Sequence, residues 1–221
     1  MNSKLIELIN KIAVKQSLYT VYSDFIELTA LMISNTCVFN EKREKQYINT
    51  ISKYREEGKL FPLLYLELVE EMNKGFNDVL GSLFMELGLG SKHTGQFFTP
   101  YHVAQATARA LFDKEQIDKQ IEERGYISLC EPSCGGGGMV IAFAEEMYKN
   151  GYNPQKQLVV GCNDLDVKGV YMTYVQLSLY GVPAVVNHAD SLTLSKYDTF
   201  KTPTYILDGW EFRRRQNING G

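Results

Sequence analysis

The second half of the chain alternates short apolar runs with helical patterns. From about residue 126, the runs YISLC, QLVVGC and AVVNHAD are separated by MVIAFAEEMYKN and VKGVYMTYVQLSLYG. A short apolar run between turn signals predicts a buried strand, and apolar residues three and four apart predict a helix. Strands that alternate with helices form crossover units, which place the strands parallel in one sheet. The sequence therefore predicts the α/β fold class, with a partial doubly wound, Rossmann-like sheet.

Residues 1–92 carry a different pattern, which predicts an α-helical domain. Apolar residues lie three and four apart in LIELINKIAV, YSDFIELTALMI, KQYINTISKY and LLYLELVEEM. FNDVLGSLFMELGL adds another helix and ends in a glycine-containing stop. We expect the domain boundary within GLGSKHTG, residues 88–95, and a second domain over residues 93–221.

The composition is that of an ordinary globular protein, with 44% hydrophobic and 22% charged residues. No run approaches the length of a membrane span, and no charged-then-apolar signal pattern opens the chain, so we expect no membrane association. The four cysteines include no CxxC pair, which argues against a disulfide framework or a zinc site. We therefore expect a cytoplasmic protein without a metal site.

The formal net charge is −3, so a polyanionic partner such as DNA would have to be met by a local basic patch. The best candidate is Arg213–Arg215, backed by Lys196 and Lys201. A solvated basic tail explains the same residues equally well.

A glycine run, EPSCGGGGM, lies between the first predicted strand and its helix. Glycines at this point let the backbone turn sharply and approach a ligand closely. The spacing differs from the GxGxxG of dinucleotide folds and lacks the GK[ST] ending of a phosphate loop. Glu131 at the end of the strand would repel a phosphate, so the loop favours a ligand with an amino group or a positive charge.

Acidic residues also end the second and third predicted strands. Asp164 is placed to accept hydrogen bonds from ribose hydroxyls, and Asp190 is placed to accept one from an adenine amine. A single acid in such a position is more often a helix cap or a solvated loop residue. Three acids at three consecutive strand ends, with a glycine loop on the first, predict a ligand site at that edge of the sheet.

The segment GQFFTP, residues 95–100, precedes an alanine-rich helical pattern. Thr99 as N-cap and Pro100 at the first helical position would explain themselves as a helix start. That account gives no role to Gln96, Phe97 and Phe98, for which core packing is one explanation and a ligand contact is another.

Together these segments resemble S-adenosylmethionine-dependent DNA methyltransferases, in particular the modification subunits of type I restriction–modification systems. That family methylates the exocyclic amine of adenine. The resemblance implies that GQFFTP closes over the methionine part of the cofactor, that EPSCGGGGM is the family's glycine loop, and that HADSL contacts adenine; DVLG at 78–81 also fits. The cofactor-binding residues that it implies are Gln96, Phe97, Phe98, Thr99, Pro100, Glu131, Ser133, Gly135, Gly137, Asp164 and Asp190.

The family's catalytic motif, Asn or Asp followed by Pro-Pro and an aromatic residue, has no full match here. Its acceptors take the two protons of the adenine amine and direct the nitrogen lone pair toward the methyl group, while the aromatic ring stacks on the flipped base. The six prolines include no adjacent pair. The nearest candidate is Thr202-Pro203-Thr204-Tyr205, so we expect Thr202, Pro203 and Tyr205 at the catalytic position and impaired catalysis.

The leading hypothesis is an S-adenosylmethionine-binding, adenine-specific DNA methyltransferase-like protein that is degenerate or completed by another chain. A non-catalytic interaction or decoy module that binds a restriction–modification partner is the alternative. An active methyltransferase for RNA, protein or a small molecule is a third hypothesis.

Self-association, or a partner chain, is expected from the sheet edge. TYILDGW, residues 204–210, is predicted as a fourth strand, and the strand order of the family places it beside the first strand. Its outer edge would offer unpaired backbone groups, which tend to recruit another strand. We therefore expect a homodimer through this edge or a partner that covers it.

Overall fold

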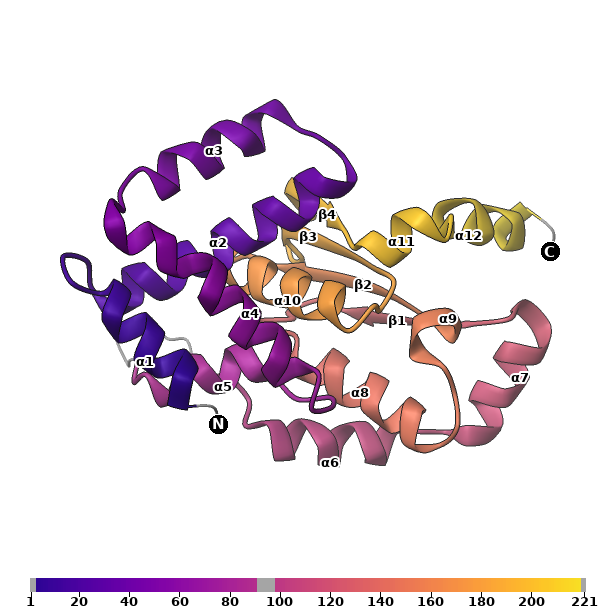
Figure 1. The fold of residues 1–221 in the computed structure, drawn as a ribbon. Coiled ribbons are helices and arrows are strands. Elements are labelled where there is room, and N and C mark those ends of the chain that lie inside the picture. The colour runs from indigo at the N-terminus through magenta and orange to yellow at the C-terminus, as the bar shows by residue number, and fades with distance from the viewer. Residues whose placement is uncertain (1–2, 91–97, 220–221) are drawn as a thin grey trace.

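The computed structural model describes residues 3–90 and 98–219. Its first part is helical (Figure 1), with α1 (Ser3–Ile12), α2 (Leu18–Cys37), α3 (Glu41–Ile51), a 3-10 turn η1 (Glu56–Leu60), α4 (Phe61–Met72) and α5 (Val79–Glu86). Polar side chains start three of these helices: Ser17, Asn40 and Asp78 each accept a hydrogen bond from a backbone N–H in the first turn. The helical periodicity of this region is thus confirmed.

The second part begins with two helices and continues with alternating strands and helices. Its elements are α6 (Tyr101–Leu111), α7 (Lys114–Arg124), β1 (Ile127–Glu131), α8 (Gly138–Lys149), α9 (Pro154–Gln157), β2 (Leu158–Asp164), α10 (Val167–Leu179), β3 (Ala184–Asp190), β4 (Ser195–Lys201), α11 (Pro203–Leu207) and α12 (Trp210–Asn219). None of the helices among the described residues is long and apolar enough to cross a membrane.

The four strands form one sheet in the order β1-β2-β3-β4. β1, β2 and β3 run parallel, with Cys130 opposite Gly161. β4 runs antiparallel to β3, so that Ser195 pairs with Asp190 and Lys201 pairs with Val185. The predicted α/β class and the three parallel strands are confirmed. Because these three strands are parallel, their carboxyl ends meet at one edge of the sheet.

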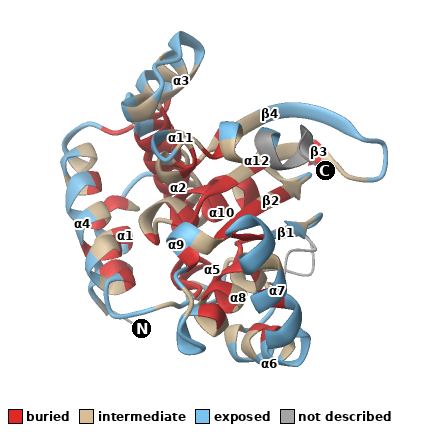
Figure 2. Cartoon of the chain, turned by 90° about the vertical axis from the view of Figure 1, so that its right-hand side faces the viewer, coloured by how far each residue is buried: buried red, intermediate tan, exposed pale blue. Residues whose placement is uncertain are grey.

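The two faces of the sheet are covered by different helices. Leu158, Val160 and Cys162 of β2 belong to the large core that includes α8 and α10, and α2 and α5 pack on the outer side of α10. Val159, which points to the opposite face, packs in a smaller cluster with Tyr205 and Trp210. Figure 2 shows β2 and α10 buried over most of their length, whereas most of β4 is exposed.

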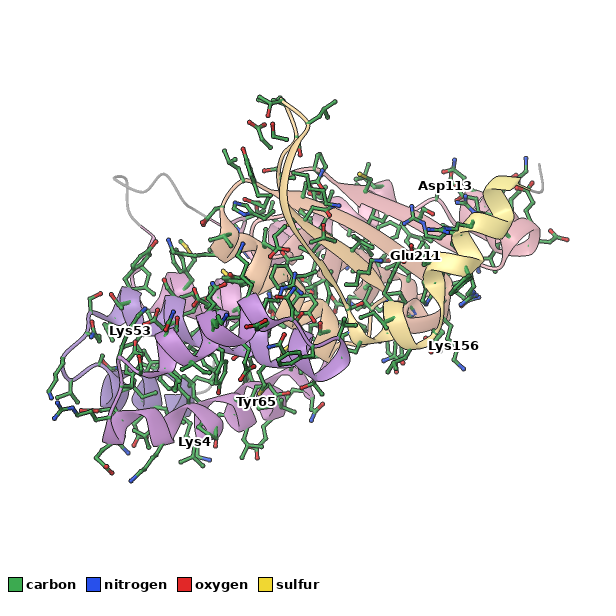
Figure 3. All side chains as sticks on the ribbon, turned by 90° about the horizontal axis from the view of Figure 1, so that it is seen from above. Lys4, Lys53, Tyr65, Asp113, Lys156 and Glu211 are labelled. Carbon is green, nitrogen blue, oxygen red and sulfur yellow. The ribbon has the colours of Figure 1, made fainter. Side chains whose placement is uncertain are left out.

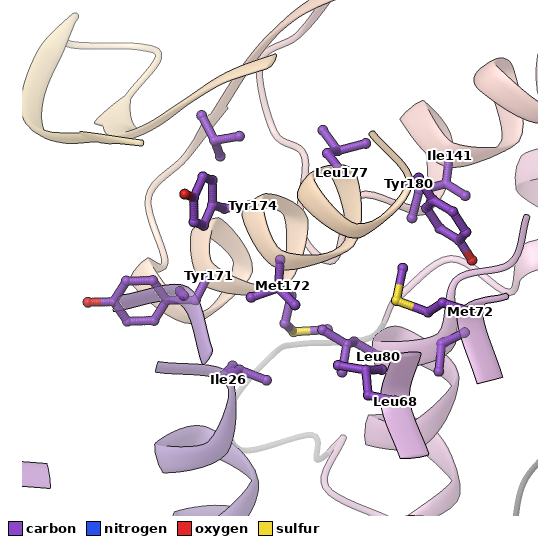
Figure 4. Close-up of a cluster of buried hydrophobic side chains, with 14 of the residues drawn as sticks. Ile26, Leu68, Met72, Leu80, Ile141, Tyr171, Met172, Tyr174, Leu177 and Tyr180 are labelled. Atoms are coloured by element: carbon purple, nitrogen blue, oxygen red, sulfur yellow. The ribbon is translucent and has the colours of Figure 1, made fainter. Parts of the chain in front are cut away.

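One hydrophobic core joins the helical region to the α/β region. Met172 of α10 lies in the same buried cluster as Ile26, Leu68 and Leu80, as the close-up in Figure 4 shows. A polar contact also joins the two regions: the Leu80 N–H donates to the Gln176 side-chain oxygen of α10 over 3.1 Å. The division into two domains stays a prediction, because much of the expected boundary, residues 91–95, lies outside the described residues.

The strand predicted over residues 204–210 is wrong. Pro203 begins the short helix α11, and Trp210 begins α12. The fourth strand is instead Ser195–Lys201, which lies beside β3 and not beside β1. Proline suits the first helical turn, where its missing N–H would have no partner. The apolar residues of the segment serve a helix that packs on the sheet face. The exposed strand edge expected at 204–210 is therefore absent, and the argument for self-association through it falls.

Candidate functional site

A cavity of about 260 Å³ lies at the carboxyl ends of β1 and β2, where an open parallel sheet binds its ligands. Helix α5, the segment before α6, the glycine loop and the start of α10 contribute its walls. The lining residues are Asp78, Phe98, Thr99, Ser133, Cys134, Gly135, Gly136, Gly138, Met139, Asp164, Asp166 and Gly169. The structure thus brings together Phe98, Thr99, Ser133, Gly135 and Asp164 of the predicted cofactor residues.

The glycine run is required by backbone conformation and by close contacts. Gly135 and Gly137 have φ angles of 50° and 91°, which L-residues with a side chain rarely adopt. A Cβ atom added to Gly135 would lie 3.3 Å from the Phe98 ring, and one added to Gly137 would lie 3.0 Å from the Thr173 hydroxyl oxygen. The loop is therefore held tightly between the segment before α6 and helix α10. Gly137 packs against Thr173 of α10 and is not among the residues that line the cavity.

Asp164 anchors this loop at the end of β2. One carboxylate oxygen accepts from the Gly135 N–H over 2.6 Å, and the other accepts from the Asp166 N–H over 2.9 Å. These bonds orient the carboxylate at the wall of the cavity, where lone pairs that they leave free can accept from a ligand.

Phe98 closes the side of the cavity nearest to α5. Its ring packs edge-on against Phe84, with the centroids 5.1 Å apart. Phe98 and Thr99 also line a neighbouring cavity of about 520 Å³, to which Pro100 contributes. Pro100, not Thr99, is the N-cap of α6, and no side chain caps this helix, so the predicted Thr99 cap is wrong. Gln96 and Phe97 lie outside the described residues.

Glu131 and Asp190 end their strands as predicted but are engaged locally, outside the cavity lining. A Glu131 carboxylate oxygen accepts from the Ser133 N–H over 3.1 Å, within the same loop. An Asp190 oxygen accepts from the N–H groups of Leu192 and Thr193, and these bonds, led by that of Thr193, lower the pKa of Asp190. In the structure, Asp190 thus fills the ordinary role of a turn cap.

The structure does not bring Thr202, Pro203 and Tyr205 to the cavity. Because β4 runs antiparallel to β3, Thr202 lies at the amino end of β3, where its N–H donates to the Ala184 carbonyl oxygen. The Thr202 hydroxyl donates to the Val182 carbonyl oxygen and accepts from the Ala184 N–H, both over 2.9 Å. Tyr205 is 5% exposed and packs in the apolar cluster of the sheet face. These groups therefore pack at the amino ends of the parallel strands, away from the cavity.

Several residues at the site escaped the sequence analysis, among them Asp78 and Gln176. Asp78, the cap of α5, lines the cavity although it belongs to the helical region. Gln176 of α10 is fully buried, and its amide nitrogen donates both to Asp78 (2.8 Å) and to the Gly136 carbonyl oxygen (2.7 Å). The DVLG segment was the only signal for Asp78, and a polar residue within a helical pattern carries no signal for Gln176.

The predicted basic patch is partly neutralised within the chain. Glu211 of α12, labelled in Figure 3, pairs with Lys201 at 2.6 Å and with Arg215 at 3.0 Å. The Arg213 guanidinium lies 4.0 Å from the centre of the Trp210 ring. The four cysteines are free thiols, and no cluster of three metal-ligating side chains occurs among the described residues.

Comparison with known proteins gives one family and one similar structure. A family model described as N-6 DNA Methylase matches residues 79–213. A solved structure from Listeria monocytogenes, described as a class I S-adenosylmethionine-dependent methyltransferase, is 15% identical with a TM-score of 0.45. The similarity covers 87% of this chain and 55% of that protein, so the chain spans about half of its length. No match was found among curated proteins.

Proposed function

The chain belongs to the N-6 DNA methylase family, and we propose that it is an adenine-specific DNA methyltransferase-like protein of the type I restriction–modification kind. Membership implies S-adenosylmethionine as the cofactor. The observation that carries the proposal is the convergence of Phe98 and Thr99, the glycine loop and Asp164 on one cavity at the carboxyl ends of the parallel strands.

The residues present fit this cofactor by charge. The described lining of the cavity includes three carboxylates, Asp78, Asp164 and Asp166, and no lysine or arginine. Such a lining repels a polyphosphate and attracts a cation. S-adenosylmethionine carries a sulfonium, an ammonium and one carboxylate, so its net charge is positive. In the proposed arrangement, Asp164 accepts from the ribose hydroxyls, and Phe98 with the glycine loop encloses the methionine part.

The cofactor supplies an electrophilic methyl group, and the chain must supply the base acceptors. Neither an Asn/Asp-Pro-Pro-aromatic sequence nor a substitute at the cavity is found among the described residues: Thr202 and Tyr205 lie at the opposite edge of the sheet. Loss of one preorganised acceptor typically lowers a rate by about 100- to 1000-fold. We therefore propose that this chain alone binds the cofactor without measurable methyl transfer, and that a partner chain contributes the missing acceptors.

Calorimetric titration with S-adenosylmethionine tests the cofactor site. The wild-type protein should bind, and Asp164→Asn should bind at least about 10-fold more weakly, since it loses the charge and one of the two oxygens that accept backbone N–H bonds. Asp113→Asn is the matched control, because Asp113 caps α7 away from the cavity and asparagine also caps helices (Figure 3). Absence of binding at millimolar cofactor would contradict the proposal and would favour the interaction or decoy module.

Transfer of labelled methyl groups to unmethylated duplex DNA tests the second part. The purified chain should show no transfer above background, and cell extract that contains the partner should restore it. Robust transfer by the purified chain would overturn the proposed need for a partner. Transfer to RNA or protein instead would redirect the assignment of the substrate.

A further inference from the structure

Asp78 is a buried carboxylate that reaches the cofactor cavity from the helical region. It lies at the start of α5, is 3% exposed, and lines both the main cavity and the neighbouring one. The family match starts one residue later, at Val79.

The two oxygens of Asp78 differ in their hydrogen bonds. Oδ1 accepts from the Gly81 N–H over 2.9 Å and from the Gln176 amide nitrogen over 2.8 Å. Oδ2 has no hydrogen-bond donor among the described residues, and no lysine or arginine in that part of the chain pairs with Asp78. Burial raises the pKa of this carboxyl group. A buried carboxylate with one free oxygen is unfavourable unless a charged partner arrives.

The free oxygen lies against Gly81 of its own helix, where an added Cβ atom would clash with it, and also close to the glycine loop. A Cβ atom added to Gly138 would lie 3.0 Å from Oδ2, and one added to Gly136 would lie 3.7 Å from it. Asp164 holds the loop from the other side, through Gly135. Two carboxylates therefore contact the same loop, Asp164 through Gly135 and Asp78 beside Gly138, where a side chain would crowd the Asp78 oxygen.

We propose that Asp78 binds the α-ammonium group of the methionine part of S-adenosylmethionine. This inference rests on the proposed function. An oxygen with free lone pairs needs a hydrogen-bond donor, which an ammonium group provides and a sulfonium group lacks. With the ribose at Asp164, the methionine part extends toward the opposite wall, where Asp78 lies beside Phe98 and Thr99.

The helical region then forms part of the cofactor site. Asp78 is held by Gln176 of α10, which also binds the glycine loop. Hydrogen bonds of Gln176 thus connect the start of α5, the glycine loop and α10. In this proposal, Asp78 is a specificity-determining residue for the amino acid end of the cofactor.

Calorimetry with two ligands tests the proposal. S-adenosylhomocysteine carries the ammonium group but no sulfonium, and 5′-methylthioadenosine lacks the amino acid part altogether. Asp78→Asn keeps an oxygen for Gly81 and Gln176, so the fold should persist. We expect this variant to bind S-adenosylhomocysteine about 10- to 100-fold more weakly, as for the loss of a charged hydrogen bond, and to bind 5′-methylthioadenosine within about twofold of the wild type.

Asp24→Asn is the matched control. Asp24 is also buried, lies in the helical region and pairs with Lys53 and Tyr54, away from the cavity (Lys53 is labelled in Figure 3). It should leave both affinities unchanged. If Asp78→Asn does not fold, Asp78→Ser replaces it, since serine keeps an N-cap acceptor.

The outcomes separate the two proposals. Unchanged affinity of Asp78→Asn for S-adenosylhomocysteine, or an equal loss for both ligands, would overturn the role of Asp78 while the cofactor site stands. A wild-type protein that binds neither ligand would overturn the cofactor site, and this inference with it.

Discussion

The chain contains two Thr-Pro segments that precede helices, and the fold uses them in opposite ways. Phe98-Thr99-Pro100 leads into α6 at the carboxyl ends of the parallel strands, where Phe98 and Thr99 line the cavity. Thr202-Pro203-Thr204-Tyr205 leads into α11 at the amino edge, where the Thr202 hydroxyl is completely buried between two backbone groups. The same residue types therefore form a ligand wall in one place and a structural anchor in the other.

The direction of one strand explains the difference. If β4 ran parallel to β3, the residues after it would emerge at the edge that carries the cavity. Because β4 runs antiparallel, its carboxyl end lies beside the amino end of β3, away from the cavity. Whether a motif that follows a strand can reach the cavity therefore depends on the direction of that strand.

The same substitution, threonine to valine, tests this comparison in both segments. Thr202→Val removes the hydroxyl but keeps the shape, and leaves the Ala184 N–H and the Val182 carbonyl without it. We expect a loss of about 1–3 kcal/mol in the free energy of unfolding, measured by urea denaturation, with unchanged cofactor affinity. Thr99→Val, at an exposed position, should change stability by less than about 0.5 kcal/mol. An equal cost at both positions would show that the two segments are not distinguished in this way.

A substitution in the glycine loop tests the close packing on the side of the cavity. Gly135→Ala places a side chain at φ 50° and 3.3 Å from the Phe98 ring, so it should cost about 1–2 kcal/mol in stability and weaken cofactor binding. Gly161→Ala is the control, because Gly161 lies in β2 without a positive φ and has no atom within 4 Å of an added Cβ. It should be close to neutral. A Gly135→Ala protein with wild-type stability and affinity would contradict the close packing of the loop.

The smallest expected effect concerns Asp190, at the cavity edge but outside the lining. Backbone N–H donors lower its folded pKa, so its carboxylate stabilises the folded state above the unfolded pKa of about 3.9 and loses this contribution as the pH falls through the lower, folded value. The stability difference between wild type and Asp190→Asn should therefore be present at pH 6 and shrink as the pH falls below the unfolded pKa in urea denaturation. A difference independent of pH would remove the turn-cap explanation.

Sequence patterns predicted the parallel strands well and the last strand poorly. β2 and β3 are buried in the core, which requires the continuous apolar runs that were recognised. β4 lies at the sheet edge with only Phe200 buried, so SKYDTFK shows no strand signal. TYILDGW shows the apolar content of a strand because Tyr205 and Trp210 bury their rings from a helical segment against the sheet.

The site divides in the same manner. Gly135 and Asp164 were predictable, because backbone conformation and the strand-end position depend on neighbours in the chain. Asp78 and Gln176 were not, because their place at the cavity arises from contacts with residues about 40 to 100 positions away.

Local periodicity and turn chemistry specify the fold class, the strands that bear the glycine loop and Asp164, and the end of the sheet where the cavity lies, so these features could be predicted from the sequence. The tertiary structure was needed to place Thr202 and Tyr205 at the opposite ends of the strands and Asp78 at the cavity. Strand direction and the docking of α5 on α10 depend on the packing of the whole core, and no local pattern encodes them.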